Sequence, residues 1–336
     1  MSSMNKEILD LHKKATVVDA HADALLDLLS PPARPKRYPT PRNIGERSRN
    51  GHIDLPRLLE GGVDLELFAV SQPSYATQKQ LHRTMQLFDR LYQELEAHGD
   101  KLVLLERVED VHEAEKHGKI AAMLSIEGGE AIEGDLGALR ILYRLSLRAM
   151  TLTWNNRNQI ADPATEHRTK GGLTNFGVEL IEEMNKIGIV VDVSHISDTR
   201  FFDVIQTTGS PVIASHSNCR ALCCHRRNLD DDMINALADN GGVVGITFVA
   251  RMIDERGRAS LLRVLGHLEH VAEVAGVEYV GFGSDFDGIQ ETPQDLEDVT
   301  RMPNLMEGLI RRGYSEGDIF KILGGNFLRV FKSVVG

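Results

Sequence analysis

The sequence of 336 residues is poor in cysteine and in aromatic side chains, with three of the former and 5% of the latter. Its cysteines, Cys219, Cys223 and Cys224, share one CRALCC segment, so they cannot cross-link distant parts of a fold. A second cysteine pair that would close a tetrahedral zinc site is missing from the sequence. We interpret the three as reduced thiols packed beside a helix, with metal binding by Cys-x3-Cys-Cys as the alternative.

Long apolar stretches are also missing. No run of about 18 apolar residues occurs that could span a bilayer, and the start of the chain, MSSMNKEILDLHKK, lacks the apolar core of a signal peptide. Basic residues are outnumbered, because 38 Lys and Arg face 49 Asp and Glu, for a formal net charge of -11. This balance argues against nucleic-acid or anionic-membrane binding, and we expect a cytoplasmic globular protein.

What the sequence has is a regular alternation of short apolar runs with helical segments. Segments 78–97 and 261–275, for example, each carry apolar residues at spacings of three and four. Eight runs rich in Val and Ile occur at 16–23, 63–70, 120–129, 148–155, 188–195, 210–217, 241–249 and 279–288. Such runs are typical of parallel strands covered by helices. We therefore predict a (β/α)8 TIM barrel of the metal-dependent hydrolase type as a single domain over residues 1–336, with a doubly wound sheet as the alternative.

One segment interrupts the alternation. Residues 31–52, PPARPKRYPTPRNIGERSRNGH, are rich in Pro and Arg and follow the first predicted strand. In a barrel this loop between the first strand and the first helix lies at the carboxyl-terminal rim, where active sites form. Two interpretations stay open: a cover that attracts acidic groups of a substrate, and a solvated surface loop.

Metal-ligand side chains dominate the ends of the predicted strands. The runs end in His21 and Asp23, Ser71, Glu127, Trp154 and Asn155, His195, His216, Phe248, and Asp285 with Asp287. In a parallel barrel these positions open on one face, so residues far apart in sequence can converge. Each one alone is more often a packing residue. Together they indicate a site, because buried charges and imidazoles are costly unless they are paired or metal-bound.

The chemistry of these side chains points to divalent metal. His21 and Asp23 lie on the same side of a strand and can hold one ion. His195 and His216 can supply imidazole nitrogens to a second ion, and the Glu127 carboxylate can bridge the two. A set without thiolate suits catalytic Zn²⁺, although Mn²⁺, Co²⁺ or Fe²⁺ would accept it. Two such ions activate a shared water, so the expected reaction class is metal-assisted hydrolysis.

A carboxylate at the end of the eighth run completes the expected machinery. Asp285, in GFGSDFDG, is placed to take the proton of the attacking water and to deliver it to the leaving amine. Asp287 is the alternative base, and we expect whichever of the two is not the base to cap a turn.

Several motifs occur in order along the chain: VVDAHAD, IEGGEAI, LRAMTLTWN, VDVSHIS, PVIASHS, HRRN at 225–228, VGFGSDFDG and GGNFLRVF. In combination, from about residue 16 to 333, they resemble the renal, or membrane, dipeptidase family of binuclear zinc metallopeptidases, which are (β/α)8 barrels. The resemblance implies that His21 and Asp23 bind one zinc, that His195 and His216 bind the other, and that Glu127 bridges them.

The resemblance also implies roles toward a substrate. Asp285 would be the acid/base residue, and Arg227, the second arginine of HRRN, would pair with the C-terminal carboxylate of a dipeptide through its planar guanidinium. The family cleaves dipeptides, often with a D-residue at the C-terminal position. A small dipeptide is thus the expected partner, with no nucleic acid and no membrane, and a homodimer is expected at the level of the family.

The sequence departs from the animal enzymes at two places. Trp154 stands where they have a His that contacts the substrate carbonyl, so Asn155, His167 and Arg168 become candidates for that contact, with Trp154 itself lining the substrate site. Val249 stands where they have a Tyr near the substrate carboxylate. These departures keep open hydrolysis of another small amide, an N-acyl amino acid or a lactone. A metal-binding barrel without catalysis is the third hypothesis.

Overall fold

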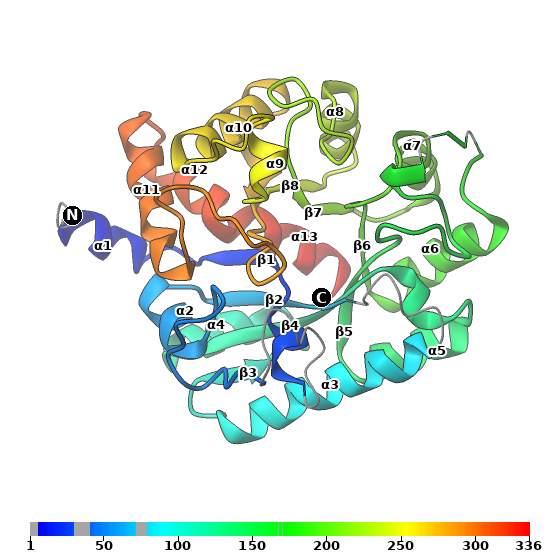
Figure 1. The fold of residues 1–336 in the computed structure, drawn as a ribbon, viewed down its shortest axis with the longest axis horizontal. Coiled ribbons are helices and arrows are strands. Elements are labelled where there is room, and N and C mark those ends of the chain that lie inside the picture. The colour runs from blue at the N-terminus through cyan, green and yellow to red at the C-terminus, as the bar shows by residue number, and fades with distance from the viewer. Residues whose placement is uncertain (1–5, 30–40, 72–78, 167, 170) are drawn as a thin grey trace.

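Parallel strands that close into a ring organise the computed structural model, which describes residues 6–29, 41–71, 79–166, 168–169 and 171–336 (Figure 1). The strands are β1 (Val18–Ala22), β2 (Leu65–Ser71), β3 (Leu102–Leu104), β4 (Ile120–Glu127), β5 (Leu147–Thr151), β6 (Val190–Asp192), β7 (Ile213–Ser217), β8 (Val243–Ile246) and β9 (Val280–Phe282). Their order is β1-β2-β4-β5-β6-β7-β8-β9, and every neighbouring pair is parallel. Sequential parallel order is that of a (β/α)8 barrel, so the predicted fold is confirmed over the doubly wound alternative.

The ring closes between its first strand and the segment just after its last. Ala22 forms a parallel bridge with Phe286. On either side of that bridge the Asp23 amide donates to the Phe286 carbonyl at 2.9 Å, and the Asp285 amide donates to the His21 carbonyl at 3.0 Å. Backbone hydrogen bonds therefore hold the two ends of the barrel together at the level where His21, Asp23 and Asp285 leave the strands.

Each of the eight predicted runs overlaps one of the barrel strands, because these runs supply residues that are buried on both faces of the sheet. All seven residues of β2 and all eight residues of β4 are buried. The additional strand β3 pairs with β4 away from the main path of the ring. It is only three residues long, which is too short for a periodicity argument to detect.

Helices surround the ring of strands, as Figure 1 shows. They are α1 (Lys6–His12), α2 (Leu55–Gly61), α3 (Gln80–Ala97), α4 (Glu109–Lys116), α5 (Leu136–Arg144), α6 (Asn175–Ile187), α7 (Asp198–Thr207), α8 (Asp231–Asp239), α9 (Ala250–Ile253), α10 (Leu261–Val274), α11 (Met302–Arg311), α12 (Glu316–Phe320) and α13 (Asn326–Val334). The predicted helical stripes at 78–97 and 261–275 are α3 and α10. Within the described ranges, no helix combines the length and apolar character that a membrane span requires.

The basic loop predicted at 31–52 is described only from residue 41 onward, and residues 30–40 lie outside the described part. In the described part Arg42 is buried and forms ion pairs with Asp27 at 3.4 Å and with Asp287 at 2.7 Å. Arg47 pairs on the surface with Glu60. Arg42 therefore anchors this loop to the barrel, because both of its carboxylate partners are buried.

The cysteines are free thiols. Cys219 and Cys223 are buried and Cys224 is exposed. The thiol of Cys219 donates to the carbonyl of His267, in α10, at 3.2 Å, and burial raises its pKa. Packing beside a helix agrees with the interpretation from sequence, and no cysteine belongs to a metal-ligand group among the described residues.

Candidate metal centre and substrate cavity

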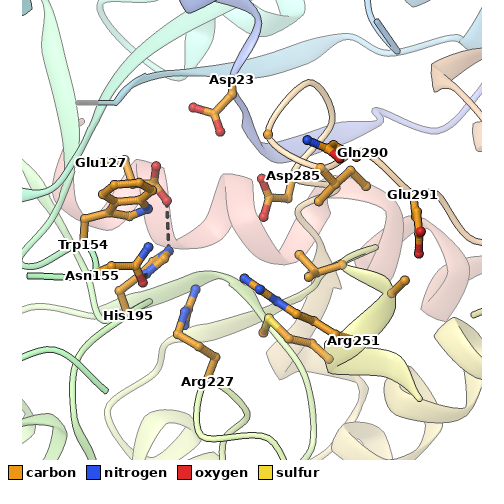
Figure 2. Close-up of a pocket in the computed structure, with 15 residues that line it drawn as sticks. Asp23, Glu127, Trp154, Asn155, His195, Arg227, Arg251, Asp285, Gln290 and Glu291 are labelled. Carbon is orange, nitrogen blue, oxygen red and sulfur yellow. Dashed lines mark hydrogen bonds and ion pairs between the residues drawn. The ribbon is translucent and has the colours of Figure 1, made fainter. Parts of the chain in front are cut away.

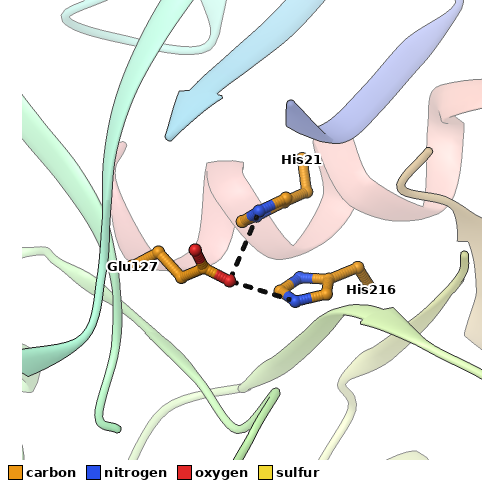
Figure 3. A group of neighbouring side chains, drawn as sticks. All are labelled: His21, Glu127 and His216. Atoms are coloured by element: carbon orange, nitrogen blue, oxygen red, sulfur yellow. Dashed lines mark ion pairs between the residues drawn. The ribbon is translucent and has the colours of Figure 1, made fainter. Parts of the chain in front are cut away.

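One carboxylate oxygen lies among three imidazoles at the carboxyl end of the barrel. Oε1 of Glu127 is 2.9 Å from Nε2 of His195, 3.4 Å from Nε2 of His216 and 3.7 Å from Nε2 of His21. Figure 3 shows His21 and His216 turned toward Glu127 from the same side, one above the other. All four side chains are buried. The barrel thus brings together residues whose positions in the sequence span almost two hundred places.

The ends of the strands position these side chains. Glu127 is the last residue of β4, His21 lies in β1 and His216 lies in β7. His195 follows β6 and has a φ of +69°, a left-handed backbone conformation that is uncommon for a residue with a Cβ. Such conformations cost free energy and are held by the surrounding structure, typically at functional sites.

A hydrogen-bonded chain fixes the orientation of His216. The Ser215 hydroxyl donates to Oδ2 of Asp192 at 2.5 Å, so its oxygen is left to accept from Nδ1–H of His216 at 2.8 Å. Asp192 is itself held by the Thr151 hydroxyl at 2.8 Å and by the amides of Ser194 and Ser215. Because the ring proton of His216 is on Nδ1, Nε2 presents a lone pair to the centre of the site.

A hydrogen bond also orients the ring of His195. Its Nδ1 faces Oδ1 of Asn155 at 3.3 Å, an acceptor, so Nδ1 carries the proton and Nε2 carries the lone pair. The two Nε2 atoms of His195 and His216 lie 2.9 Å apart. Two lone pairs at this distance repel each other. Within the described residues, Nε2 of His21 is also buried without a hydrogen-bond partner.

The protonation preferences of the cluster follow from burial. Burial, followed by the positive charge of Arg227, holds the pKa of His195 well below the ordinary value, and burial likewise lowers that of His216. Burial, with Asp23 second, raises the pKa of Glu127 well above its usual range. Neutral imidazoles and a desolvated carboxylate are an unfavourable set without a cation. Nitrogen and oxygen donors without sulfur fit a catalytic divalent ion such as Zn²⁺.

A second group adjoins the first through His21. Ligand atoms of His21, Asp23 and Asp285 lie within 4.8 Å of one another. The Ser71 hydroxyl donates to Oδ1 of Asp23 at 2.6 Å and thereby holds that carboxylate in place. Gly288 completes this side, because a Cβ at that position would overlap the carboxylate oxygens of Asp23 and Asp285.

The two aspartates of the GFGSDFDG segment have different surroundings. Asp285 lines the central cavity, and burial together with Asp23 raises its pKa well above the ordinary value. Asp287 is buried away from the cavity and accepts from Nη1 of Arg42 at 2.7 Å and from the His52 amide at 2.6 Å. Asp285 therefore has access to a substrate, and Asp287 holds the loop that contains Arg42.

A cavity of about 430 Å³ opens above these residues. It has the size of a small-molecule site. Figure 2 shows its walls, with Glu127, Trp154 and His195 on one side and Asp285, Gln290 and Glu291 on the other. Its lining is Asp23, Glu127, Trp154, Asn155, His195, Arg227, Val249, Ala250, Arg251, Met252, Asp285, Gly288, Ile289, Gln290 and Glu291.

Arg227 is the buried cation of this cavity. Only 9% of its surface is exposed, and its guanidinium makes a long contact of 3.5 Å to the carbonyl of His216. Among the described residues it forms no ion pair, and burial lowers its pKa to about 10. A guanidinium that is desolvated without a carboxylate partner is suited to binding an anion that enters the cavity.

The site residues predicted from sequence lie together at the carboxyl end of the barrel. The five predicted metal ligands meet at the carboxyl end of the barrel, and Asp285, Arg227 and Trp154 line the cavity beside them. Of the substitutes considered for the animal enzymes' His, Asn155 lines the cavity, Arg168 is not part of the lining, and His167 lies outside the described residues.

Sequence reasoning missed three residues of the site. Asp192 orients His216 through Ser215, Ser71 orients Asp23, and Arg251 lines the cavity. A signal existed for Asp192, since it is a single carboxylate inside the otherwise apolar run VVDV just before His195. Ser71 was identified as a strand end, but a serine gives no indication of its partner.

Comparisons with known proteins agree with this geometry. Dipeptidase verJ from Clonostachys rogersoniana is 37% identical over 298 residues, which are 85% of this chain and 76% of that protein. A metallo peptidase from Rhodobacter sphaeroides, solved with a phosphinate mimic of L-Ala-D-Ala, superposes with a TM-score of 0.85 at 28% identity, covering 95% of this chain and 99% of that one. Dipeptidase AC, a metallo peptidase of family M19, gives a TM-score of 0.86 at 29% identity over 96% and 99% of the two chains.

The family assignment covers nearly the whole sequence. The model of the membrane dipeptidases, peptidase family M19, matches residues 5–335. This range includes every residue of the metal-ligand cluster and of the cavity described above. The chain therefore belongs to the membrane dipeptidase family, peptidase family M19.

Proposed function

We propose that this chain hydrolyses dipeptides with two zinc ions held at the carboxyl end of the barrel. One observation carries the proposal. Oε1 of Glu127 lies within 3.7 Å of three imidazole nitrogens, and the same cavity contains the desolvated guanidinium of Arg227. A metal-ligand cluster beside an anion site is the arrangement that a peptide with a free C-terminus requires.

The ligands divide between the two ions. His21 and Asp23 would hold one ion, His195 and His216 the other, and Glu127 would contribute to both. The lone pairs of His195 and His216 support this division, since their Nε2 atoms face each other at 2.9 Å with their ring protons on Nδ1. Two divalent ions held here would act as Lewis acids and make water acidic enough to attack near neutral pH.

Proton transfer falls to Asp285. Its carboxylate lines the cavity next to Asp23, on the side opposite Glu127 in Figure 2. There it takes the proton of the attacking water and returns it to the amine that leaves. Asp287 has no such role in this proposal, because it is buried against Arg42 and His52.

Substrate binding is assigned to Arg227 and Trp154. Arg227 binds the C-terminal carboxylate of the dipeptide through paired N–H donors. Trp154 offers an apolar ring 6.4 Å from the ring of His195, measured between centroids, together with an indole N–H that can donate to a carbonyl. A cavity of about 430 Å³ is large enough for a dipeptide.

The test combines metal analysis with a substrate panel on one sample. Zinc-loaded protein is incubated with L-Xaa-D-Xaa and L-Xaa-L-Xaa dipeptides, with their C-terminal amides and N-acetyl forms, and with N-acetyl amino acids, while zinc is counted by mass spectrometry. We expect dipeptides to be cleaved and amides to be poor substrates, because an amide has no charge for Arg227 to bind. Cleavage of N-acetyl amino acids in place of dipeptides would instead establish an N-acyl amino acid hydrolase.

A further inference from the structure

A second guanidinium lines the same cavity. Arg251 is the second residue of α9, the short helix that follows β8, and its side chain is exposed at the cavity wall. In Figure 2 its guanidinium points into the cavity toward Arg227 and Asp285, whereas Glu291 lies at the edge opposite His195.

Among the described residues, the acidic side chains nearest to Arg251 in the sequence do not pair with it. Two carboxylates follow it closely in the sequence, and both are engaged elsewhere. Asp254 pairs with Arg263 at 2.6 Å, and Oε1 of Glu255 accepts from the Cys224 amide at 3.1 Å. Within the described residues, the Arg251 side chain forms neither an ion pair nor a hydrogen bond.

Two guanidiniums facing one cavity are more than a single carboxylate requires. Arg227 and Arg251 both line this cavity, so the cavity offers two guanidiniums to a ligand. One α-carboxylate satisfies Arg227 with two N–H donors. The Arg251 guanidinium, accessible and unpaired in the described part of the chain, is then left for a second anionic group on the same ligand.

We propose that Arg251 binds a carboxylate on the side chain of the C-terminal residue, so that the preferred substrates are dipeptides ending in an acidic residue. This inference rests on the proposed dipeptidase function. The side chain in question leaves the same carbon as the α-carboxylate, and Arg251 is beside Arg227, which binds that carboxylate. Bound in this way, a dipeptide would place its N-terminal residue across the scissile bond from Arg227. Figure 2 shows Glu127 and His195 on the side of the cavity away from Glu291.

The test compares substrates that differ in charge and share their shape. Values of kcat/KM are measured for Ala-Glu and Ala-Gln, each with an L- and a D-residue at the C-terminal position, on the zinc-loaded protein. For the better stereoisomer we expect Glu to exceed Gln by roughly tenfold or more, because a charge-assisted hydrogen bond replaces a neutral one. The difference should appear in KM and should shrink at high ionic strength.

Variants separate this specificity from the reaction itself. In Arg251→Met the ratio of Glu to Gln should fall to within about twofold, and in Arg251→Lys part of the preference should return. The matched control is Arg258→Met, since Arg258 is exposed on the same segment and is not part of the cavity lining. It should keep the ratio of the parent protein.

The possible results separate the role of Arg251 from the proposed dipeptidase activity. If Arg251→Met lowers kcat/KM equally for Glu and Gln, Arg251 serves the α-carboxylate, and the inference is overturned while the dipeptidase proposal stands. The same follows if the parent protein cleaves both substrates equally. If no dipeptide is cleaved by zinc-loaded protein, the proposed function itself is wrong.

Discussion

Arg42 and Asp287 form a buried ion pair at 2.7 Å although 245 positions separate them in the sequence. Replacing Arg42 by Met removes the guanidinium that pairs with the buried carboxylate of Asp287. We expect the free energy of unfolding to fall by about 3 kcal/mol, which urea denaturation measures. Arg47→Met is the matched control, because Arg47 pairs with Glu60 on the surface and should change stability by less than about 1 kcal/mol. Equal effects of the two substitutions would refute a structural role for the buried pair.

Loss of one imidazole should empty one of two metal positions. His195→Ala is expected to reduce zinc from about two ions per chain to about one and to lower activity at least 100-fold. The reason is that the ion proposed to be held by His195, His216 and Glu127 loses one of these three protein ligands. Mass spectrometry of dialysed protein counts the metal. His270→Ala, on α10 and paired with Asp231, should leave the count unchanged. An unchanged zinc content in His195→Ala would mean that His195 is not a ligand.

Asp285→Asn should separate metal binding from proton transfer. An amide can neither take nor return the proton, so kcat should fall by roughly 100-fold or more while zinc content stays near that of the parent protein. Single-turnover kinetics together with metal analysis checks both. If zinc were lost along with activity, the proximity of Asp285 to His21 and Asp23 would instead reflect metal ligation.

Asp192 should act on the metal without touching it. Asp192→Asn weakens the hydrogen bond that directs the Ser215 hydroxyl and therefore loosens the ring of His216. We expect zinc affinity to fall by roughly 10-fold to 100-fold, as measured by competition with a chelator. Asp198→Asn, at an exposed surface pair with Arg220, is the control. If Asp192→Asn bound zinc as tightly as the parent protein, Asp192 would not be needed to orient His216 for metal binding.

Asp64 predicts a pH dependence of stability away from the site. Burial raises its pKa from the ordinary 3.8 to about 7, and Oδ2 accepts from the Val17 amide at 2.8 Å. The folded state therefore binds a proton that the unfolded state has already released above about pH 4. Stability from this group is complete below pH 4 and is lost as the pH rises toward 7. Urea denaturation of metal-free protein gives the free energy of unfolding of the parent and of Asp64→Asn at pH 4.5 and at pH 7.5. The value for the parent minus the value for Asp64→Asn should be smaller at pH 7.5 than at pH 4.5. A difference that is independent of pH contradicts the raised pKa.

The sequence predicts those parts of the fold that depend on burial along one element. The eight barrel strands were predictable because each is a run that stays apolar on both faces. The meeting of the predicted metal ligands at one end of the barrel was predictable because parallel topology brings strand ends together whatever their separation. Their binding of metal stays a prediction. The single domain over residues 1–336 and the homodimer stay predictions.

The remainder depends on contacts that a linear pattern does not contain. Asp285 and Asp287 share one motif and nearly the same backbone conformation, with φ of +63° and +64°. Arg42, from the other end of the chain, distinguishes them by taking Asp287 away from the cavity. Arg251 was not predicted for a similar reason. Its place in the cavity wall and its lack of an ion pair among the described residues are visible only in the structure.

The hydrogen bonds from Asp23 to Phe286 and from Asp285 to His21 also set the timing of assembly. During synthesis on the ribosome, His21 and Asp23 are made more than 260 residues before their neighbour in the ring. Contacts of such separation are the slowest to form in folding. Until the segment around residue 286 has left the exit tunnel, the first strand lacks its closing partner, and its two ligands lie at an open edge. Capture of metal by the complete set of predicted ligands would therefore come late in the biogenesis of this protein.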